Sequence, residues 1–284
     1  MSLSAWLNIY KPKGVSSAHI VAQVKHLLKC KTGHAGTLDP LAEGVLPIAV
    51  GEATKLTSYL VDARKTYRFR IKFGSMTSTG DAEGEIVSSV DYIPRDIDEC
   101  CSVIPLFLGK ITQIPSKYSA IKIDGRRAYE LARNNVDFEM KSREIYIYSL
   151  ECLDYANGIA TYVAECSKGT YIRTLAEDIS KSLQSLGFVI ELARLKVGVF
   201  DEANSIKELT QEILMANLIN VEAVLDDILE LKIEKKSMLD VKCGKILYFN
   251  LPDIELIYLT YRGTLVSIGS IKSGCFKSAR VFNI

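Results

Sequence analysis

The stretch Gly33-His34-Ala35-Gly36-Thr37-Leu38-Asp39-Pro40 isolates one carboxylate between a glycine-flanked histidine and a proline. One interpretation is structural: Asp39 caps the N-terminus of a helix, and Pro40 takes the first helical position, where a missing N–H costs nothing. The other is functional: Asp39 stands at the boundary of an element, where a ligand can approach. The two interpretations are compatible, and this stretch alone does not choose between them.

The segments around this stretch predict both strands and helices. A short apolar strand over residues 5–9 precedes a helix over residues 18–29, which has apolar residues at helical spacing and Ser16 or Ser17 as its N-cap. Residues 65–73 alternate apolar with polar or basic side chains, which is typical of a strand with one buried and one positive face. The helix therefore leads the chain into the quoted loop, and residues 65–73 are the clearest strand.

The rest of the chain predicts further elements of both kinds. Asn157-Gly158 is a hairpin signal between strands over residues 144–155 and 159–166. A helix is expected from the N-cap Thr170 until Gly187 closes it. The remaining expectations are a weak helix over 95–104, a strand over 118–123, a helix opened by the capping box Ser205-Ile206-Lys207-Glu208, and strands over 256–260 and 265–268.

Several blocks of sequence resemble, in order, the motifs of the TruB family of tRNA pseudouridine synthases. The quoted stretch, extended to Pro47, is similar to the catalytic motif of that family. The other matching blocks are Lys11–Ser17, Gly51–Lys55, Lys65–Arg68, Pro115–Ala120 and Cys166–Arg173, so the resemblance covers roughly residues 5 to 200. It implies an α+β (mixed α/β) pseudouridine synthase fold, with a largely antiparallel central sheet flanked by helices.

The resemblance also implies two domains. Residues 1–230 are expected to form the catalytic domain. Residues 231–284 are expected to form a small C-terminal all-β domain, which resembles the PUA-type RNA-binding module over a short, glycine-rich pattern. Because that pattern is short, the RNA-binding role of residues 241–284 stays open.

Three residues are expected to be catalytic by this resemblance. Asp39 acts as nucleophile or stabilises positive charge, Tyr67 sits against the target base, and Arg173 pairs with Asp39 or with an RNA phosphate. The pattern alone allows Tyr67 to be a core aromatic. It also places Arg173 in the first turn of a helix, the unfavourable end of the dipole for a cation, at a cost of about 0.3–1 kcal/mol that an anion would offset.

The family also implies which residues meet the RNA. Those expected around a flipped base are His34, Tyr171 and Leu192, and the other expected substrate contacts are Lys11, Lys122, Arg126 and Arg127. The last three lie in a segment that resembles a mobile loop closing over RNA. A solvated surface is the alternative for each of these basic residues.

Composition and cysteine usage exclude several classes of protein. The chain has 284 residues, and 48% of them are hydrophobic, which is enough for a large domain with a smaller partner. No signal peptide and no membrane-length apolar run is recognised, so a cytoplasmic enzyme is expected. Seven cysteines without a Cys-x-x-Cys pair, together with three histidines, support neither a disulfide framework nor a metal site.

The charge distribution bears on a nucleic-acid partner, which requires a basic footprint. The net charge is only +1, but residues 1–75 carry 11 Lys and Arg against 4 Asp and Glu. Residues 76–100 are acidic, with 1 Lys or Arg against 7 Asp and Glu. Residues 241–284 are basic, with 6 Lys and Arg against 2 Asp and Glu. Basic segments separated by acidic ones could form one RNA-binding face, or they could be merely solvated.

The function implied is isomerisation of uridine 55 in the T loop of tRNA to pseudouridine. The reaction moves the C1′ bond from N1 to C5 of the base, so no cofactor or metal is expected, and a buried base must first be flipped out. The expected partner is the T arm of tRNA, and the protein is expected to be a monomer. Alternatives are a non-catalytic RNA-binding or tRNA-folding factor, and a carboxylate glycosidase with Glu43 as the second acid.

Overall fold

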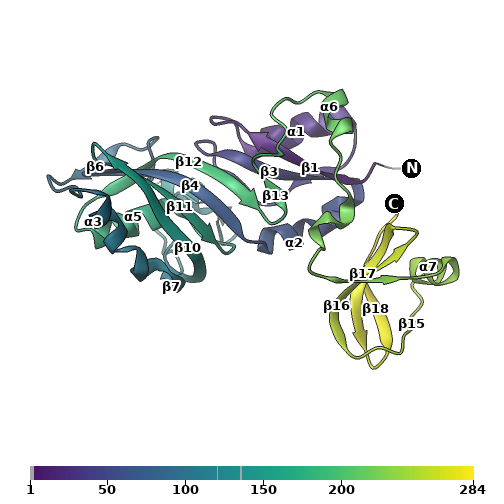
Figure 1. Cartoon of the computed structure of the whole chain (residues 1–284). Coiled ribbons are helices and arrows are strands. Elements are labelled where there is room, and N and C mark those ends of the chain that lie inside the picture. The colour runs from purple at the N-terminus through teal and green to yellow at the C-terminus, as the bar shows by residue number, and fades with distance from the viewer. Residues whose placement is uncertain (1–2, 120, 135) are drawn as a thin grey trace.

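The computed structural model describes residues 3–119, 121–134 and 136–284. Across these residues nine strands form one sheet in the order β1-β3-β12-β4-β11-β10-β7, with β2 paired to β3 and β13 to β12 (Figure 1). The strands are β1 (Ala5–Lys11), β2 (Thr32–His34), β3 (Glu43–Val50), β4 (Lys65–Phe73), β7 (Gly109–Gln113), β10 (Arg143–Ala156), β11 (Ile159–Cys166), β12 (Gly187–Val197) and β13 (Phe200–Asp201). The expected α+β fold with a largely antiparallel sheet is confirmed.

One pair of neighbouring strands, β3 and β12, runs parallel, with Ala193 opposite Glu43 and Arg194 opposite Gly44. On the other side of β12, β4 is antiparallel, and Arg194 lies opposite Tyr67. β12 therefore joins the N-terminal strands to the β4–β11–β10 part of the sheet. The loop that carries Asp39 leads directly into β3, so it lies beside this junction.

Helices cover the sheet and close its core. They are α1 (Ser17–Leu28), α2 (Thr57–Asp62), α3 (Ile97–Ser102), α5 (Ile172–Ser182), α6 (Gln211–Ala216) and the 3-10 turns η1 (Gly51–Leu56), η2 (Ile104–Phe107) and η3 (Val221–Val224). Ser16 caps α1 by accepting a hydrogen bond from the backbone N–H of His19, as the sequence predicts. Ile20 and Val24 on α1 and Leu175 on α5 are buried in one apolar cluster with the sheet, so both helices are fixed by packing.

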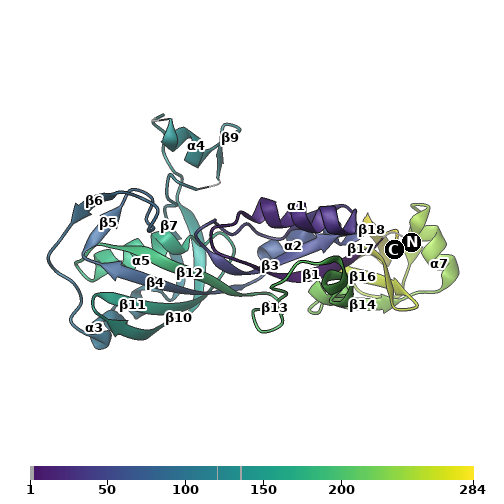
Figure 2. The same ribbon diagram turned by 90° about the horizontal axis from the view of Figure 1, so that it is seen from above.

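A small lobe is inserted between β7 and β10. It contains the two-residue strands β8 (Lys122–Ile123) and β9 (Arg126–Arg127), joined through Asp124-Gly125, and helix α4 (Ala128–Arg133). Figure 2 shows this lobe projecting away from the body of the sheet. The strand expected over residues 118–123 is therefore shorter than predicted, and Ala120 lies outside the described residues.

The C-terminal part forms a second sheet, of five strands among the described residues, in the order β14-β16-β17-β18-β15. Its elements are β14 (Leu229–Lys232), α7 (Lys235–Lys242), β15 (Leu247–Tyr248), β16 (Ile254–Tyr261), β17 (Thr264–Lys272) and β18 (Cys275–Val281). A separate short pair, β5 (Ser75–Thr77) and β6 (Ile86–Ser89), belongs to neither sheet. The C-terminal sheet curls, as expected for a PUA-like unit, but α7 means that it is not all β. Leu265, Ile268 and Phe282 share an apolar cluster with Trp6 and Leu56 of the N-terminal part.

Three local predictions are wrong. Asp39 caps no helix, because residues 39–42 form a turn closed by the Ala42 N–H and the Asp39 carbonyl, 3.1 Å apart. The capping box at Ser205 opens no helix, because Ile206 pairs with β1, and α6 begins later with Thr210 as its N-cap. Gly187 does not close a helix, because α5 ends at Ser182 and Gly187 begins β12.

Candidate active site

The Asp39 loop is held by side chains from outside it. The Ser17 hydroxyl, at the start of α1, donates to the Leu38 carbonyl at 2.8 Å and accepts from the Leu38 N–H at 2.9 Å. Both partners are buried, so water does not compete for these bonds. The backbone next to Asp39 is therefore fixed, whereas the Asp39 side chain keeps 43% of its surface exposed.

The Arg173 guanidinium lies between two carboxylates. Its Nη2 donates to Asp39 Oδ2 at 3.0 Å, and its Nη1 donates to Asp81 Oδ2 at 3.0 Å. The carbonyl oxygens of Thr79 and Tyr118 accept from the same two nitrogens, each at 3.0 Å. Because the Arg173 side chain is only 8% exposed, this arrangement holds the Asp39 carboxylate in one orientation at the edge of solvent.

Asp81 is a site residue that the sequence analysis missed. Its side chain is 2% exposed, and its Oδ1 accepts from the Thr79 hydroxyl at 2.6 Å and the Glu83 N–H at 3.0 Å. Both carboxylate oxygens are thus occupied, which makes Asp81 a support for Arg173. It lies in a turn-rich segment with no motif of its own, so only its place beside Arg173 identifies it.

A cavity of about 230 Å³ opens beside Asp39. It is lined by the expected residues Asp39, Tyr67, Tyr171, Arg173 and Leu192, which come from four separate segments of the chain. Burial raises the pKa of the half-buried Tyr67 hydroxyl, and the nearby Arg194 charge opposes this shift. The deprotonated, anionic form of Tyr67 is therefore disfavoured at this position.

Tyr171 is held through its backbone by Gln113, which the sequence analysis also missed. The Gln113 amide accepts from the Tyr171 N–H at 2.8 Å and donates to the Tyr171 carbonyl at 3.1 Å. The N-cap of α5 is Tyr171, one residue after the predicted Thr170, and Arg173 lies in the first turn, as predicted. Gln113 ends β7, so the base of the inserted lobe is connected to the segment that carries Arg173.

Comparisons with known proteins agree with this geometry. A protein-family model described as the TruB family pseudouridylate synthase N-terminal domain matches residues 24–172. The tRNA pseudouridine synthase B of Rickettsia akari (strain Hartford) is 52% identical over 289 residues, covering 98% of both chains. The protein of the same name from Rickettsia bellii (strain OSU 85-389) is 50% identical, covering 99% of both. The chain belongs to the TruB family.

Solved structures support the fold of this TruB family member over its whole length. The structure described as a Cbf5-Nop10-Gar1 complex contains a chain that is 22% identical, with a TM-score of 0.74, covering 98% of this chain and 85% of that one. The chain matched in an H/ACA RNP bound to a substrate RNA containing 2′-deoxyuridine is 21% identical, with a TM-score of 0.72. That match covers 99% of this chain and 85% of that one.

Lys11 does not fit its expected role as a substrate contact. Its side chain is fully buried, and its ammonium donates to the carbonyls of Pro12 at 2.9 Å, Val15 at 2.7 Å and Pro40 at 3.5 Å. Burial lowers the pKa of Lys11 to about 8, with the Asp39 charge acting in the opposite direction. In this TruB family member Lys11 therefore supports the turn that follows Asp39.

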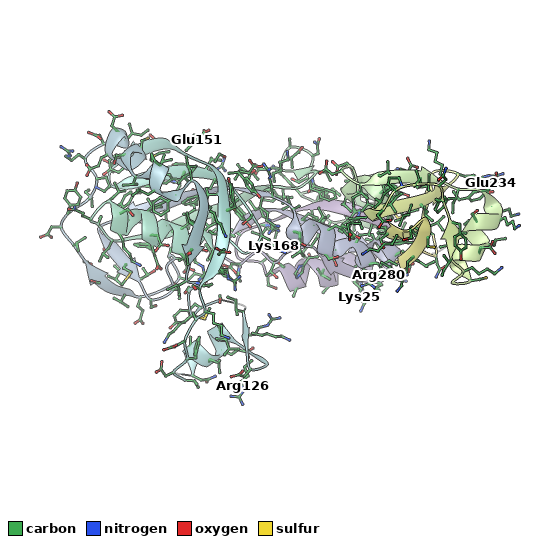
Figure 3. The ribbon with its side chains drawn as sticks, turned by 90° about the horizontal axis from the view of Figure 1, so that it is seen from below. Lys25, Arg126, Glu151, Lys168, Glu234 and Arg280 are labelled. Atoms are coloured by element: carbon green, nitrogen blue, oxygen red, sulfur yellow. The ribbon has the colours of Figure 1, made fainter. Side chains whose placement is uncertain are left out.

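The other expected RNA contacts do not line the cavity. His34 lies half-buried in β2, where burial, and next the Arg194 charge, lower its pKa. Lys122, Arg126 and Arg127 are exposed on the inserted lobe, and Figure 3 shows Arg126 far out on it, with Lys168 on the body of the protein. Any contact between these residues and substrate requires an RNA that extends beyond the cavity.

Among the described residues, no group of three or more His, Cys, Asp or Glu side chains could hold a metal ion. No helix in the part of the chain that the structure describes is long and apolar enough to cross a membrane.

Proposed function

We propose that this protein converts uridine 55 in the T loop of tRNA to pseudouridine, with Asp39 as the catalytic carboxylate. The observation that carries the proposal is the Arg173 guanidinium, which holds a solvent-accessible Asp39 at the wall of a cavity beside Tyr67 and Leu192. Family membership and the names of its full-length relatives support the same reaction and the same class of RNA. We also propose that the protein acts in the cytoplasm and is a monomer.

The chemistry needs little more than this site offers. Breaking the C1′–N1 bond, rotating the base and joining C1′ to C5 leaves no net oxidation, so the atoms balance without a co-reactant. Asp39, paired with the Arg173 guanidinium, presents a carboxylate that can attack or stabilise an electron-poor centre. Arg173 fixes the direction from which that carboxylate approaches.

The cavity suits a nucleotide that has left its stack. Tyr67 and Leu192 give an aromatic and an apolar wall, and such walls are what an everted base exchanges for its stacking neighbours. Asp39 and the turn at Ser167–Thr170 both line the cavity, so a nucleotide bound there lies beside the carboxylate. We propose that Tyr67 packs on this base, with removal of the C5 proton as its further role.

The experiment compares wild type with Asp39→Asn on an unmodified tRNA transcript, with pseudouridine mapped by sequence position. Wild type is expected to modify position 55 only, and Asp39→Asn to form no product while it still binds the transcript. Product formation by Asp39→Asn near the wild-type rate would refute the catalytic role. A wild type that binds tRNA without modifying it would favour the non-catalytic RNA-binding factor.

Glu43→Gln is the matched control. Glu43 is the acid closest to Asp39 in sequence, but it lies in β3 and does not line the cavity. It is expected to retain activity, because the isomerisation uses one carboxylate. If wild type instead releases free uracil and Glu43→Gln loses that activity, the result would support the two-carboxylate glycosidase.

A further inference from the structure

A second arginine lies in the wall of the cavity, and neither the sequence analysis nor the reaction outlined above uses it. Arg194, in β12, is 1% exposed and lines the same cavity as Asp39 and Tyr67. Its Nε donates to the Val45 carbonyl at 2.8 Å, its Nη2 to the Gly36 carbonyl at 3.1 Å and its Nη1 to the Thr37 carbonyl at 3.4 Å. These carbonyls lie on both sides of Asp39 in the chain.

The charge of Arg194 is not neutralised as that of Arg173 is. Arg173 bonds two carboxylates, whereas Arg194 donates to three backbone carbonyls and forms no ion pair among the described residues. A guanidinium has five N–H groups, of which the carbonyl bonds occupy three, and the Tyr67 hydroxyl lies within hydrogen-bonding reach of the same guanidinium. A buried charge without a partner of opposite sign is costly, so such residues are kept mainly where the charge acts on something.

The charge of Arg194 shifts the pKa of several neighbouring side chains. After burial, Arg194 is the leading influence on the pKa of His34 and of Lys65, and it lowers both. It also opposes the rise in the pKa of Tyr67. The cavity wall is therefore positive on the side of Tyr67, opposite in sign to Asp39.

The backbone fixes where this charge lies. Arg194 is opposite Tyr67 in the antiparallel β12–β4 pair and opposite Gly44 in the parallel β12–β3 pair. Gly44 has φ +107, and a Cβ there would lie 2.2 Å from the Arg194 carbonyl oxygen. The strands thus meet too closely for a side chain at position 44, which fixes the backbone of Arg194 beside the cavity, and the three carbonyl bonds then hold its guanidinium.

We propose that Arg194 is a catalytic residue that stabilises the negative charge on the detached uracil during the reaction. This inference rests on the proposed function. When the C1′–N1 bond breaks, its electron pair leaves with the base and spreads over N1, O2 and O4. C1′ meanwhile bonds to the Asp39 carboxylate, or forms a double bond to C2′ as that carboxylate takes the C2′ proton. When C5 attacks C1′, the carboxylate leaves C1′ or returns the proton to C2′. The C5 proton then passes to solvent, the ring regains its C5–C6 double bond, and N1 takes up a proton, so no atom or electron is gained or lost overall.

Arg194 takes no proton in this sequence, because a guanidinium stays charged throughout the accessible pH range. Its contribution is a fixed positive charge and N–H donors that are already in place when the base becomes anionic, which is the most effective form of electrostatic catalysis. The same role applies whichever route C1′ takes. The carbonyl bonds hold the guanidinium in the cavity wall.

The test varies the residue and the leaving base together. Arg194→Lys keeps the charge, and Arg194→Gln keeps hydrogen bonding without it. Each is compared with wild type in single-turnover reactions on tRNA containing uridine or 5-fluorouridine at the target position, read as disappearance of the starting nucleoside. Fluorine makes the detached base a more stable anion, so it reduces the need for a cation.

We expect Arg194→Gln to be slower than wild type on uridine by roughly 100-fold to 1,000-fold, the usual effect of removing one such donor. Arg194→Lys is expected to lie between them. On 5-fluorouridine both losses should shrink at least about tenfold, with tRNA affinity unchanged. Equal losses on the two substrates, or Arg194→Lys as slow as Arg194→Gln, would overturn the proposal and leave Arg194 as a support of the Asp39 loop.

Two controls distinguish failure of the Arg194 assignment from misfolding of a variant and from failure of the proposed function. Urea unfolding of each variant shows whether a rate loss follows loss of structure, and if Arg194→Gln does not fold, the leaving-base comparison of wild type with Arg194→Lys decides alone. If wild type forms no pseudouridine, the proposed function fails. If wild type is active and the leaving base makes no difference to the variants, only the assignment of Arg194 fails.

Discussion

Replacement of Gln113 by leucine tests whether the site is held together from the base of the inserted lobe. Gln113 is 1% exposed, and its amide makes both hydrogen bonds of the Tyr171 backbone described above. Leucine has a similar size and removes both bonds. The Tyr171 carbonyl keeps its bond from the Leu175 N–H, at 2.9 Å, so only the Tyr171 N–H is left unpaired. An unpaired buried N–H costs about 1–3 kcal/mol, so the free energy of unfolding should fall by about that amount.

The activity of Gln113→Leu should fall as well, because Tyr171 leads into the turn that carries Arg173. A displacement of about 1 Å in a positioning group costs up to roughly 100-fold in rate, so the single-turnover rate on tRNA should fall within that range. Urea unfolding followed by circular dichroism gives the stability change. Gln211→Leu, at an exposed glutamine that begins α6, is the control and should stay within about 0.5 kcal/mol of wild type. A loss below about 1 kcal/mol, or full activity in a destabilised Gln113→Leu, would refute the reasoning.

Two further predictions concern charge. Because burial lowers the pKa of Lys11 to about 8, the unfolded chain binds more protons than the folded one between that pH and the ordinary value of 10.5. The free energy of unfolding of wild type should therefore rise relative to Lys11→Met as the pH increases from 8 to about 10, and a constant difference in denaturant titrations would contradict this. On the inserted lobe, Arg126→Ala should lower the slope of log affinity for tRNA against log salt by about 0.7–0.9, whereas the distant Arg95→Ala should not. Identical slopes for Arg126→Ala and wild type would remove Arg126 from the interface.

Elements whose pattern is local could be predicted from the sequence. β4 follows the alternation over residues 65–73, and the β10–β11 hairpin turns at Asn157 and Gly158, whose φ values of 52° and 73° suit the residues present. Helix α1 begins at the predicted cap because Ser16 meets its partner three residues later. In each case the interactions that define the element lie within a few residues.

Elements decided by distant contacts were not predictable in this way. The Ser205 capping box gives no helix because the Ile206 N–H bonds to the Asn8 carbonyl of β1, at 2.8 Å, and this sheet contact overrides the local signal. Asp81 and Gln113 meet their partners 92 and 58 positions away, and nothing in their own neighbourhoods marks them. The motifs identify Asp39 and Arg173, and the fold supplies the groups that hold them.

One apolar cluster joins the N-terminal and C-terminal parts of the chain. Trp6 of β1 and Leu56 of η1 on one side and Phe282, just after β18, on the other are each fully buried, and Lys55 donates a hydrogen bond of 2.7 Å to the Val281 carbonyl. A flexible linker would let each part bind a ligand independently, but this buried cluster holds the two parts at one distance and one angle. Any ligand that contacts both parts must therefore present its contact groups at that fixed spacing.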